Sequence, residues 1–127
     1  MKKSEIGTFG EDLVEKDLIS KHHKIIARNY WQPWGEIDII ALSPDQTLVF
    51  FEVKTMWCGD DSSESLKPED QMTGAKIKKL QRTASLYAAS KEARRYIKKG
   101  WQIDLAAVVL KSAGEHTITY YENVSGS

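Results

Sequence analysis

The sequence predicts a single α/β domain in which helices flank a central sheet. Three observations support this fold class. The chain has 127 residues, the usual size of one domain. Its patterned segments follow the order helix, three strands, helix, two strands. The central strands are apolar on both faces, which is typical of a sheet covered on each side.

The first helix is expected over residues 4–22 and the first strand over residues 24–31. The apolar side of this helix is formed by Ile6, Phe9, Leu13, Val14 and Leu18. Gly7 and Gly10 interrupt it, and each costs about 1 kcal/mol of helix stability relative to alanine. We therefore expect these glycines to allow a close approach of the helix to the sheet.

The next two strands form an antiparallel hairpin. They are expected over residues 35–42 and 47–56, and the residues between them, Ser-Pro-Asp-Gln, have the composition of a tight turn. So short a connection requires the strands to run in opposite directions.

Residues 57–72 have loop composition, and so long a loop predicts a mobile or functional segment. A long helix is expected over residues 73–98, ended by Gly100. Strands at 101–110 and 116–121 follow, and a flexible tail is expected from about residue 122. Residues 1–127 therefore form one domain.

The composition excludes several classes of protein. No apolar run approaches the length of about 20 residues that a transmembrane helix needs, so no membrane partner is expected. The N-terminus lacks the apolar region of a signal peptide. A single cysteine, Cys58, excludes an internal disulfide and a cysteine-rich zinc site. These features predict a cytoplasmic protein.

A net charge of zero conceals one basic segment. Residues 1–72 contain eight Lys or Arg and fourteen Asp or Glu, whereas residues 73–100 contain nine Lys or Arg and one acidic residue. Such a segment suits a polyanionic partner, although a solvated helix face would have the same composition. The residues near its start that are expected to contact phosphates are Lys76, Lys79 and Arg82.

Charged residues inside the apolar hairpin strands are the feature of the sequence that indicates a reaction chemistry. Residues two apart share a face of a strand, so Glu36 lies with Asp38, and Glu52 lies with Lys54. A register that sets Asp38 beside Glu52 would bring two carboxylates together, and such a pair needs a cation. Mg²⁺ or Mn²⁺ fits these oxygen ligands, and the backbone carbonyl of Val53 could add another. In a nuclease, Lys54 would orient water or stabilise the transition state.

Other interpretations of these residues remain open. Asp38, Glu52 and Lys54 could form an internal salt bridge without a catalytic role. We expect Glu36 to support the site rather than bind metal directly. Three tryptophans flank the hairpin strands, and we expect them to pack in the core or in loops, with stacking on bases as the alternative. They are Trp31, Trp34 and Trp57.

Four sequence blocks resemble the uncharacterised bacterial YraN family of the PD-(D/E)XK nuclease-like superfamily, which includes restriction endonucleases and archaeal Holliday junction resolvases. The blocks are Gly-Thr-Phe-Gly-Glu at 7–11, Arg-Asn at 28–29, Gly-Glu-Ile-Asp-Ile-Ile-Ala at 35–41 and Phe-Glu-Val-Lys-Thr at 51–55. The resemblance implies a restriction-endonuclease-like αβββαβ core with a mixed sheet. It also implies that Asp38 and Glu52 bind metal, that Lys54 is the catalytic lysine and that Glu11 is a helix-borne acid, acting directly or through water.

The chain departs from the family pattern at two places. The third strand continues with Thr55-Met56 where the family has Thr-Arg, so one expected phosphate contact is missing. The first helix ends at His22-His23 where the family has glycine.

The sequence therefore predicts a Mg²⁺-dependent or Mn²⁺-dependent endonuclease that hydrolyses DNA phosphodiester bonds, with branched or single-stranded DNA as the structure-specific substrates. The alternatives are a non-catalytic nucleic-acid-binding module that retains the nuclease fold and an accessory protein that acts through an interface. RNA in place of DNA, one metal ion or two, and a homodimer in place of a monomer remain open.

Overall fold

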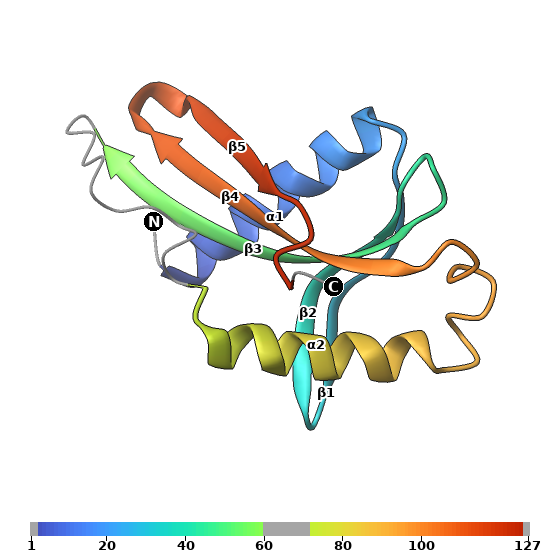
Figure 1. The fold of residues 1–127 in the computed structure, drawn as a ribbon. Coiled ribbons are helices and arrows are strands. Elements are labelled where there is room, and N and C mark those ends of the chain that lie inside the picture. Colours follow the sequence, from blue (N-terminus) through green and yellow to red (C-terminus); the bar gives the residue numbers. More distant parts are fainter. Residues whose placement is uncertain (1–2, 60–71, 126–127) are drawn as a thin grey trace.

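The computed structural model describes residues 3–59 and 72–125. It has one five-stranded sheet with a long helix on each side (Figure 1). The elements are α1 (Lys3–Ser20), β1 (Lys24–Gln32), β2 (Gly35–Leu42), β3 (Leu48–Gly59), α2 (Gly74–Ala88), β4 (Trp101–Lys111), a short 3₁₀ turn η2 (Ser112–Gly114) and β5 (His116–Tyr121). The predicted α/β class is confirmed.

The strands lie in the order of the chain, β1-β2-β3-β4-β5. All neighbouring strands are antiparallel except β3 and β4, which are parallel along almost their whole length. A parallel pair needs a crossover connection, and α2 lies within this one. The sheet is therefore mixed, as expected, and α1 to β4 form the restriction-endonuclease-like αβββαβ core.

Each face of the sheet has its own hydrophobic core. On one face Val14 and Leu18 of α1 pack against Phe51 of β3. On the other face Leu80 and Tyr87 of α2 belong to the cluster around the other side of β3, centred on its neighbouring phenylalanine. Because successive side chains of a strand point to opposite faces, this division shows that β3 is covered on both sides.

The first helix ends two residues earlier than predicted, at Ser20. His23 N–H donates to the carbonyl of Leu18 at 2.9 Å, and His22 N–H donates to that of Ile19 at 3.0 Å. This pair of bonds is a Schellman motif, which requires a left-handed residue between the helix and the following chain. His22 takes that conformation, with φ 68°, although glycine adopts it with less strain.

One of the two glycines of α1 allows close helix–sheet contact, as predicted, and the other does not. A Cβ atom at Gly10 would overlap Oγ1 of Thr55 on β3 and would lie 2.8 Å from the Cβ of that residue. A Cβ atom at Gly7 would meet nothing within 4 Å. Gly10 therefore sets the distance between α1 and β3.

The hairpin of β2 and β3 has the expected tight turn. Ser43 N–H donates to the carbonyl of Thr47 at 2.9 Å, and the side chains of Ser43 and Asp45 accept the N–H of Thr47. The third strand extends to Gly59, beyond the predicted end at residue 56, so the first three residues of the predicted loop are strand. The rest of that loop, residues 60–71, lies outside the described residues.

The second helix is shorter than predicted. It ends at Ala88, and residues 91–96 form turns instead of continuing to residue 98. The hydroxyl and the backbone N–H of Ser90 both donate to the carbonyl of Tyr87, at 2.6 Å and 2.9 Å. The turns bury Ala93 in the core beside α2, so tertiary packing outweighs the helical propensity of this segment.

The last two strands lie where predicted. A tail was expected from about residue 122, but residues 122–125 form turns, and Val124 N–H donates to the carbonyl of Ile103 at 2.9 Å. No helix in the described part of the chain is both long and apolar enough to span a membrane.

The outer strand β1 is irregular. Its register against β2 shifts between Ile25 and Ala27, which marks a β-bulge, and Asn29 has a positive φ of 51°. Beyond these residues the two strands stay paired to the hairpin tip, where Gln32 faces Gly35. The tip is therefore an ordered part of the sheet.

We expect Gly10→Ala to lower the free energy of unfolding by about 1–3 kcal/mol, because the new methyl group would overlap Thr55. Gly7→Ala is the matched control in the same helix, and its better helix propensity should raise stability by up to about 1 kcal/mol. Urea denaturation measures both variants. Equal stabilities would show that α1 does not depend on the contact with Thr55.

We expect His22→Gly to raise the free energy of unfolding by about 1 kcal/mol, because glycine adopts the left-handed conformation without the steric strain of a Cβ atom. Gly100→Ala is the inverse control. Gly100 has φ 85° and open space around its Cα, so alanine there should destabilise through backbone strain alone. Loss of stability in His22→Gly would instead assign the exposed imidazole a stabilising role at the helix end.

Candidate active site

The site begins where β2 and β3 separate. Their ladder runs from Leu42 opposite Leu48 to Ile39 opposite Phe51 and ends there. The next backbone N–H of β3 that points towards β2, that of Val53, donates to Oδ2 of Asp38 at 2.8 Å. The side chain of Asp38 thus replaces a strand-to-strand bond, while the β1–β2 hairpin continues away from β3 (Figure 1).

This position makes Asp38 an unusual carboxyl group. Burial and the nearby charge of Glu52 raise the pKa of Asp38 to about 7, against the stabilising effect of the Val53 N–H. The charges of Glu11 and Glu36 raise this pKa further. A cation would be bound most strongly at the point that is closest to all of these carboxylates.

Glu52 and Lys54 lie on the α2 side of β3. The alternation of β3 assigns them this face, because Phe50 belongs to the α2-side core. Nζ of Lys54 lies 3.7 Å from Oε1 of Glu52. Burial raises the pKa of Glu52 even though the charges of Lys54 and Lys76 oppose the shift. Lys54 therefore compensates the negative charge of Glu52 only in part.

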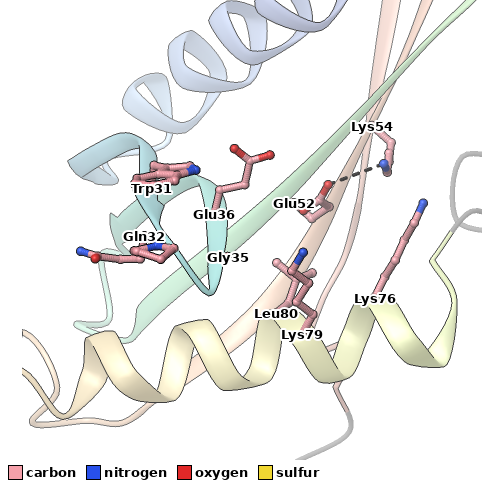
Figure 2. A pocket seen from close by; sticks show the side chains of 10 residues that line it. Trp31, Gln32, Gly35, Glu36, Glu52, Lys54, Lys76, Lys79 and Leu80 are labelled. Atoms are coloured by element: carbon pink, nitrogen blue, oxygen red, sulfur yellow. Dashed lines mark ion pairs between the residues drawn. The ribbon is translucent and has the colours of Figure 1, made fainter.

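A pocket of about 380 Å³ lies between the β1–β2 hairpin, β3 and the first half of α2. It is lined by Trp31, Gln32, Pro33, Gly35, Glu36, Glu52, Lys54, Lys76, Lys79 and Leu80. Figure 2 shows the amino groups of Lys76 and Lys79 extending from α2 towards β3. The helix begins at the cap Thr73 and has no acidic residue in its first turn, so its positive end adds to the field of the lysines. The pocket therefore combines carboxylates with cations that suit a phosphate.

Glu11 extends from α1 towards the site, but its carboxylate already forms an ion pair with an arginine. Nη2 of Arg28 on β1 lies 3.1 Å from Oε1 of Glu11, and its Nη1 lies 2.7 Å from Oδ1 of Asp12. Although burial opposes the charged form, these hydrogen bonds raise the pKa of Arg28. Arg28 therefore holds Glu11 close enough to act on Asp38 while occupying one of its oxygens.

The carboxylate oxygens available here meet part of the requirements for binding a hard divalent cation. Mg²⁺ in proteins is commonly held by one or two carboxylates, with water and substrate phosphate completing the shell, and Asp38 and Glu52 supply such a pair. Among residues 3–59 and 72–125, no group of three or more His, Cys, Asp or Glu side chains forms a ready-made metal cage. Val53 acts here through its N–H, and its carbonyl as a ligand stays a prediction.

Two residues that line the pocket were not predicted to be site residues in direct contact with a ligand. Glu36 was expected only to support the site, but it is exposed and lines the pocket. Trp31 lines it as well, opposite Glu36 in the hairpin register. Their positions beside the turn could have revealed both, because residues paired across a hairpin share a face. Of the three predicted phosphate contacts, Lys76 and Lys79 line the pocket and Arg82 does not.

Comparisons with known proteins identify the family to which the chain is similar. The family model of the uncharacterised protein family UPF0102, which is the YraN family, matches residues 10–108. A UPF0102 protein of Clostridium novyi is 34% identical over 119 residues, which is 93% of this chain and 92% of that protein. A UPF0102 protein of Corynebacterium diphtheriae is 34% identical over 119 residues, 94% of this chain and 89% of that protein. The expected family resemblance is thus confirmed.

We expect Asp38→Asn to stabilise the metal-free protein by about 1–3 kcal/mol near pH 8. The pKa of Asp38 in the folded state, about 7, lies above the value of an unfolded chain, so folding favours the protonated form. Wild-type stability should therefore fall as the pH rises from about 4 to about 7, and the asparagine variant should avoid this loss. Thermal melting in chelator at several pH values measures the difference.

Asp45→Asn is the opposite control. Hydrogen bonds from Ser43 and Thr47 lower the pKa of Asp45, so its charged form favours folding and its removal should not stabilise the protein above pH 5. If Asp38→Asn were strongly destabilising at neutral pH, Asp38 would belong to a structural salt bridge with Lys54.

Proposed function

The chain belongs to the uncharacterised protein family UPF0102, and on this premise we propose that it is a metal-dependent endonuclease that hydrolyses DNA phosphodiester bonds, with branched or single-stranded DNA as its substrates. One observation supports this function above the others. Glu52 and a neighbouring lysine line a pocket whose other wall carries two further lysines, and the charge of Glu52 helps to raise the pKa of the buried Asp38.

The reaction needs a bound phosphate, an attacking water and compensation of the charge that develops at phosphorus. Mg²⁺ or Mn²⁺, when bound, supplies Lewis-acid stabilisation of that charge. Asp38 and Glu52 are the residues that would hold the ion. Hydrogen bonding from Val53 fixes the carboxylate of Asp38, so its position does not depend on the ion.

In this proposal three lysines bind the phosphate and assist the reaction. Lys76 and Lys79 attract and orient the substrate phosphate from α2. Lys54 adjoins Glu52 on β3 and is the residue that orients the attacking water or stabilises the transition-state charge. Glu11 adds negative charge from the opposite side of the sheet, which raises the pKa of Asp38 and strengthens the attraction for a cation, while Arg28 limits its freedom.

The principal alternative is a non-catalytic nucleic-acid-binding module. The Glu52–Lys54 ion pair and the Arg28–Glu11 bond favour it, because each occupies a group that catalysis would require. Such a module would bind DNA with strong salt dependence, and it would show neither Mn²⁺ affinity nor cleavage.

We expect wild-type protein with Mg²⁺ or Mn²⁺ to cleave at least one of linear, flapped and four-way-junction DNA. Glu52→Gln and Lys54→Met should each reduce cleavage by at least about 100-fold, because each removes a group that acts on the reacting phosphate. Gel analysis of labelled DNA measures the rates. The matched controls are Glu115→Gln and Lys78→Met, which change exposed residues outside the pocket lining.

Metal binding is measured separately by thermal melting. Saturating Mn²⁺ should raise the melting temperature of the wild type, and it should have little effect on the Asp38→Asn, Glu52→Gln double variant. Cleavage that persists in both single active-site variants would indicate a contaminant or another site. DNA binding without metal stabilisation or cleavage would establish the non-catalytic module instead.

A further inference from the structure

The tip of the β1–β2 hairpin displays two indole rings to solvent beside the pocket. Trp31 is 66% exposed and Trp34 is 40% exposed. The expectation of core packing is therefore wrong for both side chains. Trp101, in contrast, packs edge to face against Phe50 with ring centroids 5.5 Å apart. Large exposed aromatic groups at an ordered position are characteristic of binding surfaces.

The tip is held firmly by its neighbours. Tyr30 packs against Tyr87 of α2 with ring centroids 5.2 Å apart, so the strand is anchored directly before Trp31. A Cβ atom at Gly35 would overlap Oγ1 of Thr83, which shows how closely β2 approaches α2. The exposure of Trp31 therefore belongs to a fixed surface, and little conformational entropy would be lost when a ligand stacks on it.

Trp31 belongs to the pocket and not to a separate patch. It lies opposite Glu36 in the register, and both residues line the pocket with Glu52 and Lys54. Figure 2 shows Trp31 and Glu36 towards the hairpin end of the pocket, while Lys54 and Lys76 lie towards the other end. An aromatic residue and the phosphate-attracting lysines thus line one cavity.

A nucleotide with an unpaired base matches this pairing of surfaces. Its phosphate needs the cations, and its base has a free π-face that can stack on an indole. Bases inside a duplex are stacked on one another and offer no such face. Three lysines line the pocket, and they would attract the phosphate of a single strand or of a duplex alike, so the free face of the base is what distinguishes the two.

We propose that Trp31, with Trp34 beside it, is a base-stacking platform through which the site selects unpaired nucleotides next to the bound phosphate. The proposal rests on the proposed function, since it names the substrate feature that the same pocket reads. It assigns the hairpin tip to substrate recognition and leaves the chemistry to β2, β3 and α2.

The test measures binding without cleavage. In the Glu52→Gln background, fluorescence anisotropy compares a labelled oligothymidine with a blunt duplex of equal length. We expect tighter binding of the single strand. Trp31→Ala should weaken that binding by about 5- to 100-fold, with a smaller loss for Trp34→Ala. Trp31→Phe should retain most of the affinity, because it preserves an aromatic face.

Trp57→Ala is the matched control. Trp57 is 59% exposed, and the alternation of β3 assigns it to the α1 side of the sheet, away from the pocket. Its replacement should leave binding unchanged. Equal binding of both DNAs, a preference for duplex, no DNA binding, or no effect of Trp31→Ala would each overturn the platform. Selective loss in Trp31→Ala supports it even if the wild type fails to cleave, so the two proposals can fail separately.

Discussion

The hydrogen bond from Val53 N–H to the carboxylate of Asp38 is the contact on which the candidate site depends. A β-hairpin normally satisfies such an amide with a backbone carbonyl of the neighbouring strand. Here a side chain performs that function, so β2 can turn away from β3 without leaving a buried donor unpaired. The space opened by this divergence is the pocket. The same bond fixes the carboxylate of Asp38, which is not among the residues that line the pocket.

The pocket has carboxylates on one side and lysine side chains on the other. Glu36 and Glu52 line one side, where burial disfavours the charge of Glu52, whereas Lys76 and Lys79 extend from α2 at the opposite wall. Packing on both faces of the sheet maintains this arrangement, because α1 and α2 each have a separate core against β3. The free energy of that packing is what offsets the cost of holding carboxylates together.

The sequence predicted much of this because its signals are local. Strand β2 was placed at its observed bounds, and the short turn before Thr47 correctly predicted that β2 and β3 are antiparallel. What it missed depends on tertiary contacts. The end of α2 at Ala88 follows from burial of Ala93, and the engagement of Glu11 by Arg28 joins elements whose contact no spacing rule reveals. The exposure of Trp31 likewise depends on how the hairpin leaves the sheet.

The irregular edge of β1 has a consequence for association between chains. An exposed outer strand offers a row of unpaired backbone groups along which another strand can add, and exposed tryptophans at its end would increase that hazard. The bulge between Ile25 and Ala27 and the left-handed Asn29 interrupt the regular row. The hairpin can therefore present indole rings to solvent while its edge remains a poor template for aggregation.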